Sequence, residues 1–343
     1  MNIPILNIYY MLLYAWYRLE EGKIVEVDID RTTKLVDLFT RVLLNGLTHI
    51  IKQGLFRYYI EKEGEVRFLR GKIDFIKTYQ RNLLSMGKLY CKYEEFHHNI
   101  LQNQILKATM NYLFNIESLD VRLKNDLSKL LIYFDDVETI ELKQRHFFII
   151  TIDRNIRLYG FLIKVCKIIF NNLLIDESTG ELKFKDFIRD ENEMNKLFQD
   201  FVFNFYKIEQ RDFDVSKPHI HWNIQAVNDA SATYLPRMET DIMLKSSNRL
   251  IIIDTKFYKQ TLTNRYGNPK FHSSDLYQIY SYIKQVEYED ELGKESEGIL
   301  LYPKTDKDLN EKFNFDHHKL SIRTIDLSKD WTNIHQELLN ILD

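Results

Sequence analysis

Apolar residues recur at intervals of three and four along much of the chain, a spacing typical of helices that pack one face on a core. On this pattern we expect helices over residues 3–16, 32–52, 99–114, 118–133, 155–174, 191–206 and 274–286. In residues 191–206 the apolar stripe consists of Met194, Leu197, Phe198, Phe201 and Phe205. In residues 274–286 it consists of Leu276, Ile279, Tyr280, Ile283 and Val286.

Strands are expected where apolar and polar residues alternate, or where a short apolar run lies between turn residues. The first half of the chain has such segments at residues 56–61, 65–69, 72–76 and 88–93, separated by Gly64, Gly71 and Gly87. They predict hairpins, one of which could project from the body. The whole pattern predicts a mixed α/β (α+β) fold with two domains. Residues 1–150 would form a helical and β-hairpin domain, and residues 151–343 a second domain.

Residues 239–256 read as two strands joined by a tight turn, and the register of this hairpin brings two acids together. If the loop is Ser247-Asn248, Asp241 lies directly opposite Asp254. Opposed residues on one face have Cβ atoms about 4.5–5.5 Å apart, so the two carboxylates repel unless a cation lies between them. Strand alternation also places Lys256 on the same face as Asp254.

Two acids and a lysine in this arrangement are suited to phosphodiester hydrolysis. Oxygen ligands without a nearby thiolate or imidazole favour Mg²⁺ or Mn²⁺ over zinc. Such a metal lowers the pKa of a bound water, and a lysine can hold that water and stabilise the transition state. Asp-x-Lys alone is a common pattern. Here it follows the apolar run 250–253, typical of a strand buried on both faces, so the charged pair is expected at a cleft.

Charge along the chain is uneven. The formal net charge of −3 is not typical of a free-standing nucleic-acid-binding protein. Residues 237–270 nevertheless hold seven basic residues (Arg237, Lys245, Arg249, Lys256, Lys259, Arg265 and Lys270) against three acidic ones (Glu239, Asp241 and Asp254). We expect this local excess to surround the two aspartates and contact phosphates. The alternative is an ordinary solvated surface.

Other sequence features exclude several functions. Cys91 and Cys166 are read as free thiols in a reducing cytoplasm. No run of about 18 apolar residues predicts a transmembrane helix, and residues 3–16 are expected to form a core helix instead of a signal peptide. The chain has no Gly-x-x-x-x-Gly-Lys-Ser/Thr motif, so we expect no nucleotide bound through a P-loop. It also shows no Cys/His finger for reading bases.

Several blocks of the sequence resemble the McrC family, the endonuclease subunits of GTP-dependent McrBC restriction systems that cut DNA carrying modified cytosine. Two blocks resemble the nuclease core of this family, Leu235-Pro-Arg-Met-Glu-Thr-Asp-Ile242 and Ile253-Asp-Thr-Lys-Phe-Tyr258. Further similar blocks run through the chain, at Asn7-Ile-Tyr-Tyr-Met-Leu-Leu-Tyr-Ala-Trp16, Arg70-Gly-Lys-Ile-Asp-Phe75, Asn103-Gln-Ile-Leu-Lys107, Lys270-Phe-His-Ser-Ser-Asp-Leu-Tyr-Gln278, Leu300-Leu-Tyr-Pro303 and Ile334-His-Gln-Glu-Leu-Leu339. The resemblance therefore spans essentially the whole chain.

The resemblance implies a PD-(D/E)XK endonuclease domain in the C-terminal half, residues 151–343, with a mixed sheet flanked by helices and with Mg²⁺ as cofactor. Asp241 and Asp254 would hold the metal, the Thr255 carbonyl would be a possible further ligand, and Lys256 would position the water. No proline immediately precedes Asp241, where Thr240 stands instead. Nucleases of this type often have a metal-assisting glutamate on the preceding helix, and an accessory Gln-x-x-x-Tyr pair.

For these two auxiliary roles the sequence offers Glu193 and Gln278. Glu193 lies on the polar shoulder of its predicted helix, but the first turn of a helix favours acids through the helix dipole alone. Gln278 and Tyr282 are four residues apart on one helix face and resemble the accessory motif of RecB-like nucleases. A simple surface pair is the alternative for Gln278.

The resemblance also implies partners. The N-terminal domain would dock into the pore of a hexameric McrB-like AAA+ GTPase and stimulate it. GTP would be bound by that partner and not by this chain. The substrate would be double-stranded DNA with methylcytosine, as in a type IV restriction system of antiviral defence, with no role at a membrane. Two other readings stay open, namely a non-cleaving adaptor that activates the GTPase and a stand-alone RecB-like DNA nuclease.

Overall fold

A computed structural model of the chain describes residues 3–25, 34–150, 156–175, 182–224, 234–265 and 268–343. The fold is mixed α/β, as predicted, and it divides into two compact units. Unit 1 contains Met1–Gly22 and Asp186–Asp343, and unit 2 contains Thr33–Lys185. The division therefore lies at residue 185 and not at the predicted 150. The reason is that residues 157–171 pack on helices of unit 2, whereas the first helix of the chain packs in unit 1.

Unit 2 is built around four helices, which match predicted ones: α3 (Leu35–Gln53), α5 (Leu101–Phe114), α6 (Val121–Leu131) and α8 (Arg157–Asn171). Shorter helices accompany them: α2 (Leu19–Ile24) at the division, α4 (Phe75–Gln80), α7 (His146–Ile149), η1 (Leu83–Met86) and η2 (Ile132–Phe134). Two residues of the block 103–107 hold surrounding loops. Asn103 donates to the carbonyls of Phe56 and His98 at 2.9 and 2.7 Å, and Lys107 donates to those of Phe134 and Val137.

The strands of unit 2 form a three-stranded antiparallel sheet in the order β1-β3-β2: β1 (Tyr58–Val66), β2 (Lys72–Ile73) and β3 (Leu89–His97). A separate pair consists of β4 (Leu173–Ile175) and β5 (Leu182–Phe184). The predicted break at Gly64 is wrong, because Gly64 lies inside β1 opposite Cys91. Gly71 is a real break. Its φ is +61°, and a Cβ there would lie 2.3 Å from the carbonyl oxygen of Lys92, so only glycine fits.

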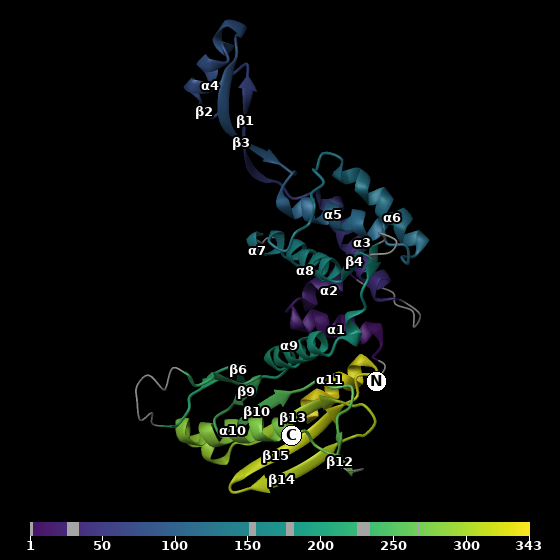
Figure 1. Ribbon diagram of the computed structural model, residues 1–343, viewed down its shortest axis with the longest axis vertical. Helices are drawn as coiled ribbons and strands as arrows, with labels where there is room; N and C mark the ends of the chain where they lie inside the picture. Colours follow the sequence, from purple (N-terminus) through teal and green to yellow (C-terminus); the bar gives the residue numbers. More distant parts are fainter. Residues whose placement is uncertain (1–2, 26–33, 151–155, 176–181, 225–233, 266–267) are drawn as a thin grey trace. The chain divides into compact units, whose positions relative to one another are not determined.

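Unit 1 contains a six-stranded mixed sheet in the order β14-β15-β13-β10-β9-β6 (Figure 1). Its strands are β6 (Asp214–Ser216), β9 (Ile242–Lys245), β10 (Leu250–Thr255), β13 (Glu297–Pro303), β14 (Asn310–Phe315) and β15 (His318–Ile325). Strands β10, β13 and β15 run parallel, and the other neighbours are antiparallel. Two short antiparallel pairs accompany the sheet, β7 (His219–Ile220) with β8 (Met238–Glu239), and β11 (Thr263–Arg265) with β12 (Asn268–Lys270).

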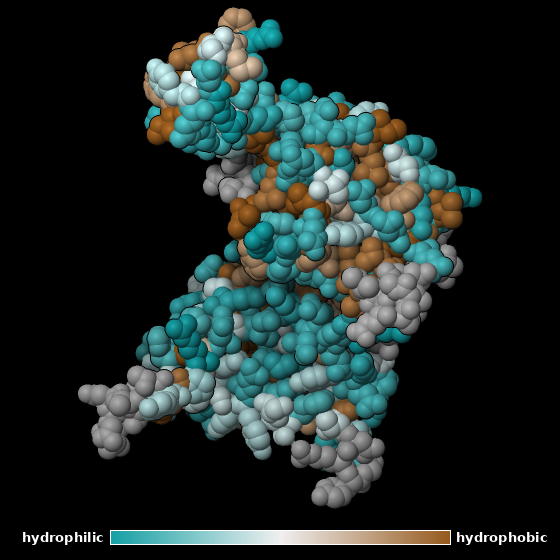
Figure 2. Space-filling model, turned by 45° about the horizontal axis from the view of Figure 1, so that its top comes forward, coloured by the Kyte–Doolittle hydropathy of each residue, from teal (hydrophilic) through white to brown (hydrophobic). Residues whose placement is uncertain are grey.

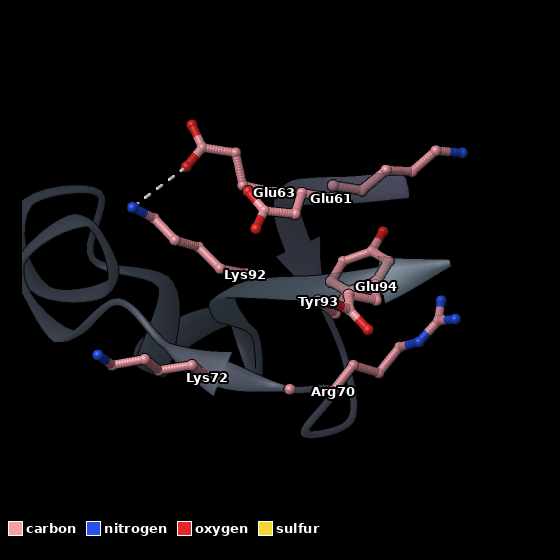
Figure 3. A pocket seen from close by; sticks show the side chains of 9 residues that line it. Glu61, Glu63, Arg70, Lys72, Lys92, Tyr93 and Glu94 are labelled. Atoms are coloured by element: carbon pink, nitrogen blue, oxygen red, sulfur yellow. Dashed lines mark ion pairs between the residues drawn. The ribbon is translucent and has the colours of Figure 1, made fainter. Parts of the chain in front are cut away.

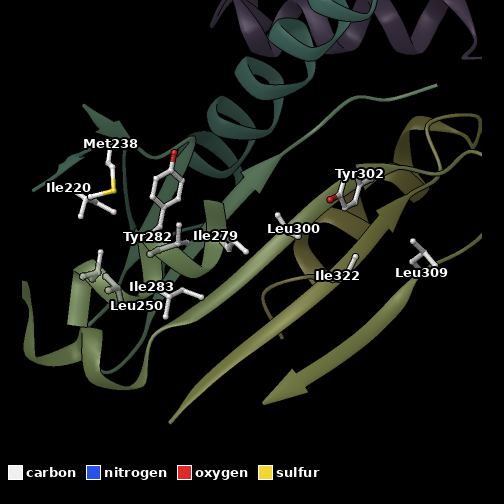
Figure 4. Packing of buried hydrophobic residues seen from close by; sticks show 12 residues of the cluster. Ile220, Met238, Leu250, Ile279, Tyr282, Ile283, Leu300, Tyr302, Leu309 and Ile322 are labelled. Atoms are coloured by element: carbon white, nitrogen blue, oxygen red, sulfur yellow. The ribbon is translucent and has the colours of Figure 1, made fainter. Parts of the chain in front are cut away.

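Three helices pack on this sheet: α9 (Glu191–Glu209), α10 (Ser273–Glu289) and α11 (Trp331–Asn340), with the short η6 (Glu291–Glu295). Helix α1 (Ile5–Ala15) and the short η4 (Phe187–Arg189) pack on α9. Figure 4 shows the core between α10 and one face of the sheet, where Ile279 and Ile283 meet Leu300. Gly298 permits this close packing, since a Cβ there would lie 2.5 Å from Ile283. The predicted stripe is wrong at Tyr280, which is 49% exposed.

The first helix of the chain is held by residues near the C-terminal end of unit 1. Asn7 donates to the carbonyls of Leu327 and Lys329, both at 2.8 Å. Tyr10 stacks on Trp331 with ring centroids 4.9 Å apart. None of the helices formed by the described residues is long and apolar enough to cross a membrane.

Candidate functional sites

The predicted register of the hairpin that carries the two acids is confirmed. Leu250 pairs with Lys245 and Ile253 with Ile242, and the turn is closed by the Ser246 amide, which donates to the Arg249 carbonyl at 2.9 Å. Asp241 and Asp254 come one position beyond the last of these pairs. The same register therefore leads to both acids at the open end of the hairpin.

Asp254 is a buried carboxylate, and few polar contacts offset the cost of removing its charge from water. Its side chain is 0% exposed, and neither carboxylate oxygen accepts a hydrogen bond of ordinary geometry. Lys256 Nζ forms an ion pair at 2.7 Å from Asp254 Oδ2. Burial raises the pKa of Asp254 to about 7, with the charge of Asp241 acting in the same direction and Lys256 opposing it. A second cation at this position would stabilise the ionised form.

Lys256 remains a cation beside Asp254. Its side chain is 16% exposed, and burial, the largest single effect, lowers its pKa. The charge of Asp254 and the hydrogen bond to it, together with the charges of Asp241 and Asp275, outweigh burial, and the pKa is raised. A charged ammonium group at the open end of the hairpin can hold a water molecule or contact a phosphate oxygen.

Asp241, in contrast, is held by three donors. Its Oδ1 accepts from Gln199 Nε2 at 2.5 Å. Its Oδ2 accepts from the amide and the hydroxyl of Thr255 at 2.8 and 3.0 Å. These bonds fix the orientation of the carboxylate in the absence of any metal. Each carboxylate oxygen can accept more than one bond, so capacity for a cation remains.

Gln199 was not identified from the sequence, and it comes from α9, the helix on which Glu193 was predicted to act. Glu193 itself is exposed, and its backbone amide donates to the helix cap Asp190. The structure does not bring the Glu193 side chain to the two acids. The signal that could have revealed Gln199 is the spacing of polar residues at positions 191, 195 and 199, one helical turn apart beside the apolar stripe.

The predicted pair of Gln278 and Tyr282 does form. Gln278 Nε2 donates to the Tyr282 hydroxyl at 2.7 Å, and this hydroxyl donates to the Glu239 carbonyl at 2.9 Å. Tyr282 is buried, which excludes a simple surface pair. The pair therefore fixes the backbone two residues before Asp241.

A further carboxylate, Asp275, lies buried on the first turn of α10. It accepts hydrogen bonds from the hydroxyls of Tyr258 and Tyr302 at 3.1 and 2.9 Å. Both tyrosines have raised pKa values, because burial and the charge of Asp275 disfavour ionisation. The sequence analysis did not single out this cluster, which joins the segment after Lys256 to α10.

The predicted ring of basic residues is partly wrong. Lys245 pairs with Asp290, and Arg249 pairs with Glu297 at 2.9 Å. Both basic residues flank the turn of the hairpin, at its closed end, whereas the acids lie at the open end. Of the seven basic residues, these two are thus unsuited to contact a substrate at the acids.

The two aspartates fit a hard divalent cation. The fit rests on Asp254, whose two buried oxygens lack hydrogen bonds, and on the all-oxygen character of the donors. No group of three or more His, Cys, Asp or Glu side chains suited to one metal ion occurs among the described residues. Any further ligands would therefore be backbone carbonyls, water or substrate oxygens, as is common for Mg²⁺.

Unit 2 has a second surface with the features of an interaction site (Figure 3). It is an open groove of about 850 Å³ on the β1–β3–β2 sheet, lined by Glu61, Lys62, Glu63, Arg70, Gly71, Lys72, Lys92, Tyr93 and Glu94. Glu61 and Glu94 are exposed and directly opposite each other. Like charges in this position repel, and a cation from a partner would relieve the repulsion.

Large apolar side chains are exposed near this groove, on the β1–β2 connection and around α4: Phe68, Leu69, Phe75, Ile76, Tyr79, Leu84 and Met86. Phe68 is 82% and Ile76 71% exposed. In Figure 2, much of the hydrophobic surface belongs to unit 2, whereas the visible face of unit 1 is mostly hydrophilic. Exposed apolar surface of this kind marks a protein interaction site.

Comparison with known proteins gives consistent matches. A family model described as McrBC 5-methylcytosine restriction system component matches residues 7–303. The chain is 33% identical over 341 residues to the type IV methyl-directed restriction enzyme EcoKMcrBC of Escherichia coli (strain K12), covering 99% of this chain and 97% of that protein.

A solved structure shares the fold. It is a refined half-complex from a tetradecameric assembly of Thermococcus gammatolerans McrB AAA+ hexamers with bound McrC. The matching chain is 18% identical, with a TM-score of 0.61 over 98% of this chain and 76% of that chain.

Proposed function

This chain belongs to the McrBC 5-methylcytosine restriction system component family, and we propose that it is the endonuclease subunit of such a system. The reaction would be Mg²⁺-dependent hydrolysis of phosphodiester bonds in DNA that contains methylcytosine. The observation that carries the proposal is the buried carboxylate of Asp254, which lacks hydrogen bonds and has Lys256 at 2.7 Å. Asp254 and Asp241 each come one position beyond the pair of Ile253 and Ile242.

Each residue has a role in this proposal. Asp241 and Asp254 hold the metal, and the Thr255 carbonyl is the further protein ligand. When bound, the metal activates a water and neutralises charge on the phosphate. Lys256 orients the attacking water and stabilises negative charge in the transition state. Gln278 acts indirectly, through Tyr282, by fixing the segment that precedes Asp241.

The architecture around the hairpin supports a PD-(D/E)XK-type nuclease domain. Leu250 and Ile252 of β10 face α10, so the alternate residues Ile251 and Ile253 face the other side of the sheet. Helix α9 packs on β10 as well, and Phe198 of α9 contacts Phe257, which continues the second face. The sheet is thus flanked by helices, and the acids lie at the end of its interior strands β9 and β10.

We further propose that the partner is a McrB-like AAA+ GTPase hexamer, which binds GTP, recognises modified DNA and is stimulated by this chain. The T. gammatolerans structure is described as AAA+ hexamers with bound McrC. The charged groove and the exposed apolar side chains of unit 2 are the surface proposed to dock on this partner. The system would act in the cytoplasm, where a reduced state suits the two buried free cysteines.

The proposal is tested by cleavage of cytosine-methylated plasmid with purified protein, Mg²⁺, GTP and the cognate AAA+ partner. Wild type is compared with Asp254→Ala and with Asp212→Ala, an exposed acid of the same unit as control. Cutting by wild type and the control, but not by Asp254→Ala, supports the proposal if it also requires the partner. Cutting without the partner identifies a stand-alone nuclease. Stimulation of GTP hydrolysis without any cutting identifies an adaptor.

A further inference from the structure

Three polar side chains of α9 bind the chain on both sides of the proposed active site. Glu191 Oε1 accepts from the amide of Lys259 at 2.9 Å, and Asn195 Oδ1 accepts from the amide of Phe257 at 2.8 Å. Gln199 donates to Asp241 at 2.5 Å. Because an α-helix has 3.6 residues per turn, positions four apart lie on one face. These contacts therefore form one row along α9.

The first two contacts replace a sheet ladder that ends at the active site. The last backbone bond of β10 to its neighbour is donated by Lys256 to the Leu301 carbonyl at 3.1 Å. Beyond it, the amides of Phe257 and Lys259 are bonded by α9 side chains and not by another strand. The position of Lys256 is thus set by the sheet on one side and by α9 on the other.

The third contact acts on a metal-binding carboxylate. An ionised carboxylate only accepts hydrogen bonds, so the amide nitrogen of Gln199 must face Asp241 and its oxygen must point away. The helix that carries Gln199 is itself anchored by the fully buried side chains of Met194, Phe198 and Phe201. The donor is therefore presented from a rigid element, which is the condition for holding a ligand in one orientation.

We propose that Gln199 is a positioning residue that preorganises Asp241 for Mg²⁺. This inference rests on the proposed function, because it takes the two aspartates as the metal site. Gln199 needs no contact with the metal. It holds Asp241 Oδ1 while Thr255 holds Oδ2, so the carboxylate does not have to be ordered when the cation arrives. Such supporting contacts commonly account for roughly 10- to 100-fold in metal affinity.

The test is Gln199→Met, which keeps the length of the side chain and removes its donor. Mg²⁺ binding to the full chain is measured by calorimetry without DNA or partner, and the Mg²⁺ dependence of cutting is measured in the complete system. We expect Mg²⁺ affinity to fall roughly 10- to 100-fold. We also expect the cutting rate to recover at saturating Mg²⁺, with the melting temperature in EDTA unchanged. Lys196→Met, an exposed position of the same helix, serves as the matched control.

The outcomes separate this inference from the proposed function. If Asp254→Ala loses Mg²⁺ binding and Gln199→Met binds as tightly as wild type, the inference is wrong and the metal site stands. If wild-type binding does not depend on Asp254, the proposed metal site is wrong and the inference falls with it. A cutting rate that stays low at all Mg²⁺ concentrations would indicate a structural lesion and contradict positioning. If Gln199→Met fails to fold, Gln199→Asn is used instead. Its side chain is one methylene shorter, so its amide donor lies farther from Asp241, and Mg²⁺ binding must weaken in the same way.

Discussion

Replacing Asp254 with asparagine is expected to stabilise the metal-free protein while abolishing cleavage. The carboxylate is fully buried, and burial raises its pKa from 3.8 to about 7. At about 1.4 kcal/mol per pKa unit, an ionised Asp254 lowers the free energy of unfolding by roughly 4 kcal/mol above neutral pH. Asparagine has nearly the same shape and no charge. The raised pKa already includes the opposing effect of Lys256, so the lost ion pair is not subtracted again, and we expect a net gain of up to about 4 kcal/mol at pH 8.

The pH dependence gives the sign of this effect. Below pH 4 the carboxyl is protonated in the folded and in the unfolded chain, and it does not penalise folding. As the pH rises from about 4 to about 7, the unfolded chain ionises first, so the wild type loses stability across this window. The variant has no group to ionise at position 254. The difference in the free energy of unfolding between the variant and the wild type should therefore grow as the pH rises through this window, and it should stay constant above it.

The assay is urea unfolding at pH 5 and pH 8, in EDTA and in Mg²⁺. In EDTA at pH 8 the variant should have the higher midpoint, and the difference should shrink at pH 5. Mg²⁺ should stabilise the wild type, because it binds the folded state only, and should leave the variant unchanged. A variant that is no more stable than wild type at pH 8, or a difference that does not shrink at pH 5, would refute the reasoning.

Three further changes test other parts of the structure. Tyr282→Phe removes a buried hydroxyl that bonds Gln278 and a backbone carbonyl, and urea unfolding should show a loss of about 1–3 kcal/mol. Thr255→Val removes one of the two donors to Asp241 Oδ2 and leaves the Thr255 amide, so Mg²⁺ titration should show weaker binding, by less than the roughly 10- to 100-fold expected for Gln199→Met, which leaves Oδ1 with no donor. Gly71→Ala places a Cβ 2.3 Å from a backbone oxygen at a φ of +61°; a GTPase assay with the partner should show lost stimulation, while calorimetry shows unchanged Mg²⁺ binding.

The hairpin that leads to the two aspartates was predictable because its register follows from local rules. A two-residue turn fixes which residues pair, and the alternation of strands then fixes the faces of Asp254 and Lys256. The helices were predictable for a similar reason, since each apolar stripe is local in sequence. The exact ends of the helices were not predictable. The continuation of β1 through Gly64 was not predictable either, because pairing with β3 overrides the tendency of glycine to interrupt a strand.

The supporting contacts of the site depend on tertiary placement and could not be read from spacing alone. Whether Glu193 or Gln199 reaches Asp241 is decided by the rotation of α9 against the sheet. Tyr280 and Tyr282 are equally aromatic, but only Tyr282 has a backbone carbonyl within reach of its hydroxyl. The prediction that basic residues surround the acids was partly wrong because it relied on nearness in sequence. Lys245 is close to Asp241 in sequence, but it lies at the far end of β9 and pairs with Asp290.

The attachment of α1 to unit 1 has a consequence for the order in which the chain folds during synthesis. Asn7 and its carbonyl partner Leu327 are separated by 320 residues, which a ribosome adds in on the order of half a minute at about 10 residues per second. Unit 2 emerges in one nearly continuous stretch and can fold meanwhile. Tyr14 of α1 can pack on Phe201 and Phe205 once α9 has been made. Tyr10 cannot stack on Trp331 until translation is almost finished. Unit 1 is thus completed last, after the unit proposed to bind the partner.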